Sequence, residues 1–212
     1  MRDYLLNAVV TLFVTIDPPG LAPIFMVLTA GRTIAERRTV ALRATVIAAI
    51  VLLAFALVGE PLIAVLGISL PAFRIAGGLL LFVIAFEMVF GRREERKSAT
   101  AQSAVEREDL RHLAVFPLAI PLIAGPGAIS ATILLASQAP GPGGIAGLLT
   151  IIVLMIGACL AVFLAADRIE KALGETGRIV VSRLLGLILA ALSVQFVADG
   201  VTAIVKAAAT QA

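Results

Sequence analysis

One segment restricts what this chain can fold into more than any other. Residues 16–23, with the order Ile16-Asp17-Pro18-Pro19-Gly20-Leu21-Ala22-Pro23, interrupt an apolar run that extends over residues 5–30. Two adjacent prolines remove two backbone donors and clash with the preceding helical turn, so a straight helix cannot continue. The Asp17 carboxylate is costly at this depth of a membrane, and lipid offers no partner to freed backbone groups. We therefore expect one half-helix to end here and another to begin, with Asp17 as N-cap and Pro18 as first helical residue.

A similar interruption returns about half the chain later. Ala124-Gly125-Pro126-Gly127 lies inside a second apolar run, residues 113–136. Paired breaks at corresponding places of two halves are typical of transporters, in which they form the substrate site. The alternative is that each break is a structural kink that packs against neighbouring helices.

The composition indicates a membrane protein. Of 212 residues, 60% are hydrophobic and 15% charged, whereas soluble domains carry about 25% charged residues. The net charge of +3 does not indicate nucleic-acid binding, because the basic residues lie in short connections between apolar runs. A single cysteine, Cys159, excludes an internal disulfide, and no Cys/His cluster suggests a metal site or a bound cofactor. Nothing resembles a hydrolase triad or a phosphate-binding loop, so we expect no enzyme.

Six runs are long enough to cross a bilayer, which takes about 20 apolar residues. They cover residues 5–30, 39–58, 71–91, 113–136, 145–166 and 179–205. Gly59-Glu60-Pro61 should end the second span, and the apolar piece 62–70 that follows should lie at the membrane interface. Residues 92–112 form the longest polar segment, for which we expect a solvated charged loop, partly helical in one alternative. The sequence thus predicts an all-α membrane domain with a first three-helix repeat (1–91), the loop, and a second repeat (113–212).

Basic residues are unevenly divided between the two sides. The connections after spans 1, 3 and 5 carry thirteen of them: Arg32, Arg37, Arg38, Arg43, Arg92, Arg93, Arg96, Lys97, Arg107, Arg111, Arg168, Lys171 and Arg178. The opposite side carries Arg2 and Lys206. Because basic loops stay in the cytoplasm, both termini are predicted to lie outside it.

The two halves also match in sequence. Pro19-Gly20 corresponds to Pro126-Gly127 at an offset of 107 residues, and Arg74 to Arg183 at an offset of 109. Three spans are an odd number, so the second half must insert upside down relative to the first. The pattern predicts an inverted-topology repeat with broken first and fourth helices.

The breaks supply most of the candidate substrate-binding residues. A half-helix N-terminus favours an anionic group such as a carboxylate, and glycine lets a ligand approach the backbone. The candidates at the breaks are Asp17, Pro19, Gly20, Gly125, Pro126 and Gly127. The glycines have an alternative role in close helix–helix contact. Asp17 could bind a coupling proton, a sodium ion or an ammonium group, or act only as an N-cap.

Three further candidates lie away from the breaks. Ser130 could donate a hydrogen bond to a ligand, although bonding to its own helix is equally compatible. Arg74 and Arg183, inside spans, could contact a substrate, or extend to the surface. Small residues such as Ala158, Ala161 and Ala165 could pack within the bundle or between protomers, which keeps a homo-oligomer open.

These motifs resemble a known family. Asp17-Pro18-Pro19-Gly20-x-x-Pro23, together with Pro117-Leu118-x-Ile120-Pro121-Leu122-x-Ala124-Gly125-Pro126-Gly127, is similar to the MarC family of bacterial inner-membrane proteins, also called UPF0056 or the neutral amino acid transporter family. The likeness covers nearly the whole chain. It implies six spans, a link to the lysine-exporter superfamily and transport of small neutral amino acids. Its motif residues here are Asp17, Pro19, Gly20, Pro23, Gly125, Pro126 and Gly127. A non-transporting scaffold or regulator, or an exporter of another small solute, is the alternative.

Overall fold

The protein is built from helices. The computed structural model describes residues 1–105 and 113–211, and no strand occurs in these two ranges. The elements are α1 (Arg2–Ile16), α2 (Pro18–Leu28), α3 (Ile34–Val65), α4 (Leu70–Val89), α5 (Arg92–Val105), η1 (Ala114–Ile123), α7 (Pro126–Ser137), α8 (Gly141–Leu164) and α9 (Ala166–Gln211). The prediction of an all-α integral membrane protein is confirmed.

The apolar helices fit the predicted number of spans. In the described residues, five helical stretches are long and apolar enough to cross a membrane: Arg2–Leu28, α3, α4, α8 and Thr176–Ala209. The pair η1 and α7, bent by 53°, supplies a sixth if it counts as one broken span. Large apolar side chains such as Ile50, Leu79 and Leu184 are exposed on the outside of the bundle. A soluble monomer rarely exposes so much apolar surface, and in a bilayer these side chains face lipid.

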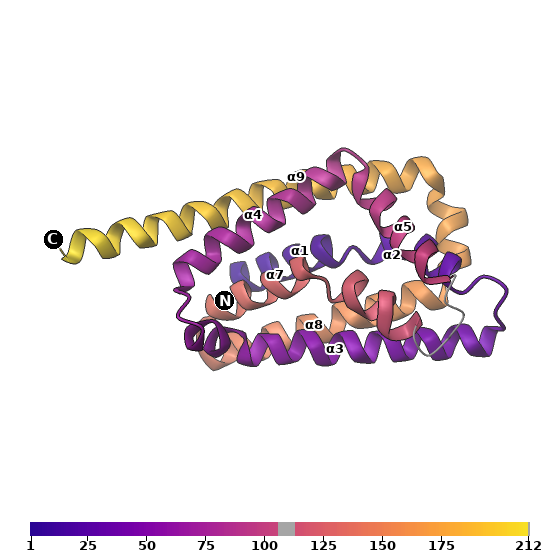
Figure 1. Ribbon diagram of the computed structural model, residues 1–212, viewed down its shortest axis with the longest axis horizontal. Coiled ribbons are helices and arrows are strands. Elements are labelled where there is room, and N and C mark those ends of the chain that lie inside the picture. Colours follow the sequence, from indigo (N-terminus) through magenta and orange to yellow (C-terminus); the bar gives the residue numbers. More distant parts are fainter. Residues whose placement is uncertain (106–112, 212) are drawn as a thin grey trace.

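The bundle has two distinct ends (Figure 1). Both termini lie at one end, and α5 lies with α2 at the other. α4 runs beside α9, and α3 runs beside α8 (Figure 1). Glycines bring the first pair close: a Cβ at Gly78 would lie 2.9 Å from the Ser193 carbonyl oxygen, and one at Gly186 would lie 3.1 Å from that of Ala85. Small residues thus permit close helix packing, as is common in membranes.

The predicted end of the second span is wrong. α3 continues through Gly59-Glu60-Pro61 and ends at Val65, so residues 62–65 belong to a helix of 32 residues. Pro61 lies near the helix end, where the loss of one hydrogen bond costs least. Gly59 lies against the Ile133 side chain of α7, at a place where a Cβ would collide with it. Packing against another helix therefore outweighs the local tendency to break.

The first two thirds of the predicted loop are helical, as the alternative expected, but they are not solvated on all sides. Residues 92–105 form α5, and two of its charged side chains, Arg93 and Lys97, are only 6% and 7% exposed. Residues 106–112 of the predicted loop lie outside the described ranges. α5 packs against α2, α4 and η1, so a polar helix forms part of the protein interior.

Candidate functional site

The first break forms around Asp17. α1 ends at Ile16, and Asp17 takes a left-handed conformation (φ 59°, ψ 63°) before Pro18 starts α2. Aspartate adopts this conformation more readily than most residues, because its short polar side chain can bond locally. Its Oδ1 accepts a hydrogen bond from the Gly20 N–H at 3.2 Å. The prediction that Asp17 caps the second half-helix is confirmed.

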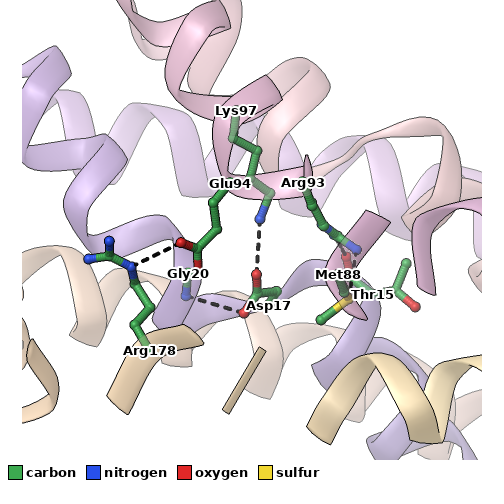
Figure 2. A network of polar contacts seen from close by, with 8 residues as sticks. All are labelled: Thr15, Asp17, Gly20, Met88, Arg93, Glu94, Lys97 and Arg178. Carbon is green, nitrogen blue, oxygen red and sulfur yellow. Dashed lines mark hydrogen bonds and ion pairs between the residues drawn. The ribbon is translucent and has the colours of Figure 1, made fainter. Parts of the chain in front are cut away.

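The other carboxylate oxygen of Asp17 forms an ion pair with α5 (Figure 2). Lys97 Nζ lies 3.2 Å from Asp17 Oδ2, and the two side chains are 8% and 5% exposed. A buried carboxylate left alone would be strongly unfavourable, so the lysine is its compensating charge. The two oxygens thus have separate partners: one caps α2, and the other holds α5.

Arg93 lies one helical turn before Lys97 and hydrogen-bonds to the last turn of α1 (Figure 2). Its guanidinium donates to the Thr15 carbonyl oxygen and to the Met88 sulfur. The Thr15 carbonyl is one of the last four of α1, which have no partner within their own helix. Among the described residues, no carboxylate forms an ion pair with Arg93. The site therefore holds one buried positive charge more than its ion pairs neutralise.

Two more ion pairs connect α5 to the bundle. Arg96 Nη1 lies 2.8 Å from Glu87 Oε1 of α4, and Arg178 Nε of α9 lies 3.4 Å from Glu94 Oε2. Figure 2 shows Glu94 and Arg178 beside the Asp17–Lys97 pair. Ion pairs therefore connect α5 to the first break and to two spans, α4 and α9.

Burial changes the acid–base properties of α5, which is not one of the apolar spans. The pKa of Lys97 is lowered to about 8. Burial is the largest cause, the attraction of Asp17 opposes it, and the positive charge of Arg93 adds to the lowering. Burial also lowers the pKa of Arg93, again opposed by Asp17. Arginine nevertheless keeps its charge in proteins.

The second break opens onto a pocket. η1 is irregularly wound: Phe116 and Ile120 have extended backbones, and each precedes a cis peptide bond to proline. Gly125 is the N-cap residue of α7 and Pro126 is its first residue, so a half-helix begins at the second break. Beside this N-terminus lies a pocket of about 290 Å³. It is bordered by the three predicted residues Gly125, Pro126 and Gly127, and by five polar residues from α1 and α5, namely Thr15, Arg93, Arg96, Lys97 and Thr100.

The glycines at the breaks owe part of their role to packing within the protein. A Cβ at Gly20 would collide with the Asp17 carboxylate, and one at Gly125 would collide with the Pro121 carbonyl oxygen. A Cβ at Gly127 would collide with Ile84 and lie 3.4 Å from Thr15 Cγ2. The last contact joins the end of α1 to the start of α7, so the two breaks approach each other. Close contact therefore accounts for the missing side chains, while the backbone of Gly125 and Gly127 borders the pocket.

The remaining sequence candidates lie elsewhere. Pro19 is half-buried beside the cap. Ser130 lies next to Gly77 of α4, and Arg74 lies next to Gly200 of α9 with a buried Nε that bonds to none of the described residues. Arg183 is exposed on α9. The structure does not bring Ser130, Arg74 or Arg183 to the pocket.

Sequence reasoning missed the charged residues of α5. Arg93, Lys97 and Ala101 follow one another at four-residue spacing, which places them on one face of a helix. That spacing was the available signal. It was weak because two of the three residues on this face are themselves charged.

Comparison with known proteins identifies the family. The sequence matches the family described as "MarC family integral membrane protein" over residues 2–205. The chain belongs to the MarC family. It is 36% identical over 202 residues to the UPF0056 membrane protein MJ1677 of Methanocaldococcus jannaschii, which covers 94% of this chain and 96% of that protein. It is 35% identical over 193 residues to the UPF0056 membrane protein YhcE of Escherichia coli, with 91% and 89% covered.

A third MarC relative extends the range of organisms. The UPF0056 membrane protein YvbG of Bacillus subtilis is 32% identical over 200 residues, covering 94% of this chain and 95% of the relative. No solved structure matches the chain. The names of these MarC proteins state that they are membrane proteins and name no substrate.

Proposed function

We propose that this protein is a secondary transporter of small neutral amino acids that works by alternating access in the bacterial inner membrane. The observation that carries the proposal is the basic pocket at the second break, which lies beside the buried carboxylate of the first. A zwitterion needs both signs of charge within a few ångströms, and the basic residues of α5 and the carboxylate of Asp17 lie close together beside the second break.

The substrate carboxylate would bind at the start of α7. Pro126 has no N–H, and the backbone N–H groups that follow it are not used within the first turn of the helix, which favours an anion. Arg93 borders the same pocket and has no carboxylate partner among the described residues. A guanidinium and a helix N-terminus aimed at one cavity are a strong combination for a carboxylate.

The size of the pocket favours a small substrate. About 290 Å³ lies at the lower end of the range of small-molecule sites, about 300–1,000 Å³. Apolar residues such as Ile84 and Leu122 border it together with the basic ones. This lining suits a short aliphatic side chain, such as that of alanine, better than a second charged group.

Alternating access would use the repeated architecture. In our proposal α1 to α4 and η1 to α9 are inverted repeats that rock against each other around the paired breaks. The charged connections lie in the cytoplasm and both termini outside it. Asp17 is the group on which a coupling proton or sodium ion would act.

Transport by the purified protein tests this proposal. The full chain is reconstituted into liposomes, and uptake of labelled glycine, alanine, lysine and glutamate is measured with and without pH and sodium gradients. We expect alanine or glycine to accumulate and lysine and glutamate to be excluded. The matched control is Arg92→Gln, which removes one exposed charge from α5 outside the pocket. Uptake of none of these amino acids by a folded protein would refute the proposal in favour of a scaffold or regulator.

A further inference from the structure

Lys97 stands between the pocket and Asp17. The Lys97 side chain borders the pocket, whereas Asp17 does not, and the Lys97 ammonium rests on the Asp17 carboxylate at 3.2 Å. A ligand in the pocket therefore meets Lys97 before it can reach the only carboxylate of the first break. The ion pair closes Asp17 off from the cavity.

We propose that the Lys97 ammonium occupies the position of the substrate's own ammonium group, and that the substrate binds by displacing it and releasing the part of α5 that follows Arg93, while Arg93 stays at the pocket. α5 is then an internal competitor and a gate. The identity of the substrate rests on the proposed function, but the competition requires only a ligand that carries an ammonium group.

The charges favour such an exchange. With α5 in place, Asp17 is paired with Lys97, and no carboxylate in the described part of the chain forms an ion pair with Arg93. With an amino acid bound, its ammonium would pair with Asp17 and its carboxylate with Arg93, while Lys97 returns to water. Every buried charge then has an opposite partner, which is the arrangement that a low-dielectric interior requires.

Lys97 is well suited to leave. Burial disfavours its charged form, and the charged groups that face it are Asp17, Arg93 and Glu94, with Cys159 of α8 nearby. α5 itself is polar, so it can enter water without exposing a large apolar face.

The position of α5 can be measured with a cysteine at Ala101, which is fully buried on the same face as Lys97. The parent protein carries Ala101→Cys and Cys159→Ala, and labelling by a water-soluble maleimide is timed in detergent. We expect slow labelling that alanine, at about ten times its Kd, accelerates by about tenfold, because binding to the open form shifts the equilibrium by the factor 1 + [L]/Kd. Propionate, which has the carbon skeleton and carboxylate of alanine but lacks the ammonium, should not accelerate it.

Substitutions of the pair provide the decisive comparison. Lys97→Gln leaves Asp17 uncompensated and Asp17→Asn leaves Lys97 uncompensated, so each should label rapidly without alanine. The double variant has a neutral pair that can hydrogen-bond, so α5 should close again and labelling should return to the slow parental rate, without a response to alanine. Arg92→Gln is the control and should behave like the parent. The return of slow labelling in the double variant also excludes misfolding as the cause.

Two results would overturn the inference. Slow labelling of Lys97→Gln would show that the ion pair does not hold α5, and acceleration by propionate equal to that by alanine would show that the ammonium is not what displaces Lys97. If alanine has no effect although liposomes transport it, the displacement is refuted and the proposed function stands. If no amino acid is transported, methylammonium replaces alanine as the probe. Acceleration by methylammonium would then support the exchange without the amino acid, and its absence would refute it.

Discussion

Replacing Arg93 by methionine separates the role of this residue in binding from its role in stability. Methionine is unbranched and fills irregular space, so Arg93→Met removes the guanidinium with little loss of volume. If the substrate carboxylate binds to Arg93, the variant loses a charge-assisted hydrogen bond of about 1.5–3 kcal/mol. Affinity for alanine should therefore fall by about 10–150-fold, since every 1.4 kcal/mol is a factor of ten.

Stability should change much less than affinity. The Thr15 carbonyl oxygen loses its donor, which costs about 1–3 kcal/mol if the oxygen stays buried. On the other hand, the variant no longer has to bury the Arg93 guanidinium, and burying such an ion costs several kcal/mol. Removing this cost stabilises the folded protein. The two effects have opposite signs and similar size. With about 2–4 °C per kcal/mol for a chain of this length, we expect Tm to stay within about 5 °C of the parent.

The assay is alanine binding to the detergent-purified protein, with thermal unfolding measured on the same samples. Arg96→Met is the matched control: Arg96 lies on the same helix and borders the same pocket, but its side chain is 60% exposed and paired with Glu87. Exposed pairs contribute about 0–1 kcal/mol, so its affinity should fall by less than about fivefold. Unchanged affinity in Arg93→Met, or equal losses in both variants, would show that Arg93 does not bind the substrate.

Three other predictions concern topology, packing and pH. Cysteines at Gln102 and Thr210 in a Cys159→Ala background should react only from the cytoplasm and only from outside, respectively; labelling of Gln102 from outside would reverse the orientation. Gly78→Leu should lower the free energy of unfolding by about 1–3 kcal/mol, because α9 backbone atoms lie 2.9 and 3.1 Å from the added Cβ. Gly157 has open space around it, so Gly157→Leu should leave the free energy of unfolding unchanged. Equal melting temperatures of the Gly78→Leu and Gly157→Leu variants would contradict the α4–α9 contact. Because burial lowers the pKa of Lys97 to about 8, the folded protein releases this proton before the unfolded chain does. Stability relative to Lys97→Gln should therefore rise from about pH 8 to the ordinary lysine pKa near 10.4, and a fall would refute the assignment.

The fold was predictable because its strongest determinants are local. The breaks follow from Pro18 and Pro126, which cannot continue a helix, and the number of spans follows from apolar length. The break expected at Pro61 did not occur, since one missing hydrogen bond near a helix end is less costly than the contact that Gly59 makes with α7. Sequence alone shows the proline but not the neighbour that decides its effect.

The site was predictable only in part. Asp17, Gly125 and Gly127 belong to apolar runs, where a carboxylate or a break has a physical meaning that can be read directly. Arg93 and Lys97 belong to a segment in which charge is the ordinary condition, so nothing marks these two as buried. The Lys97 ammonium is compensated by Asp17, which lies 80 residues away in the chain, and the Arg93 guanidinium donates to Thr15 and Met88. A cost that is conspicuous in the first span is thus balanced by a residue that looks unremarkable in its own surroundings.

Capping and the binding of an ammonium group were alternatives for Asp17 in the sequence, and in the structure Asp17 does both. Oδ1 accepts the Gly20 N–H, and Oδ2 faces Lys97. Asparagine can keep the first contact because it caps about as well as aspartate. Its amide NH2 would then face an ammonium, two donors with no acceptor between them. Asp17→Asn therefore tests the ion pair rather than the cap. We expect the cap of α2 to be kept, so that any loss of function in this variant comes from the lost contact with α5. The half-helix α2 and the gate on α5 depend on one carboxylate through different atoms, which explains why a charged residue occupies a position where a neutral cap would be less costly.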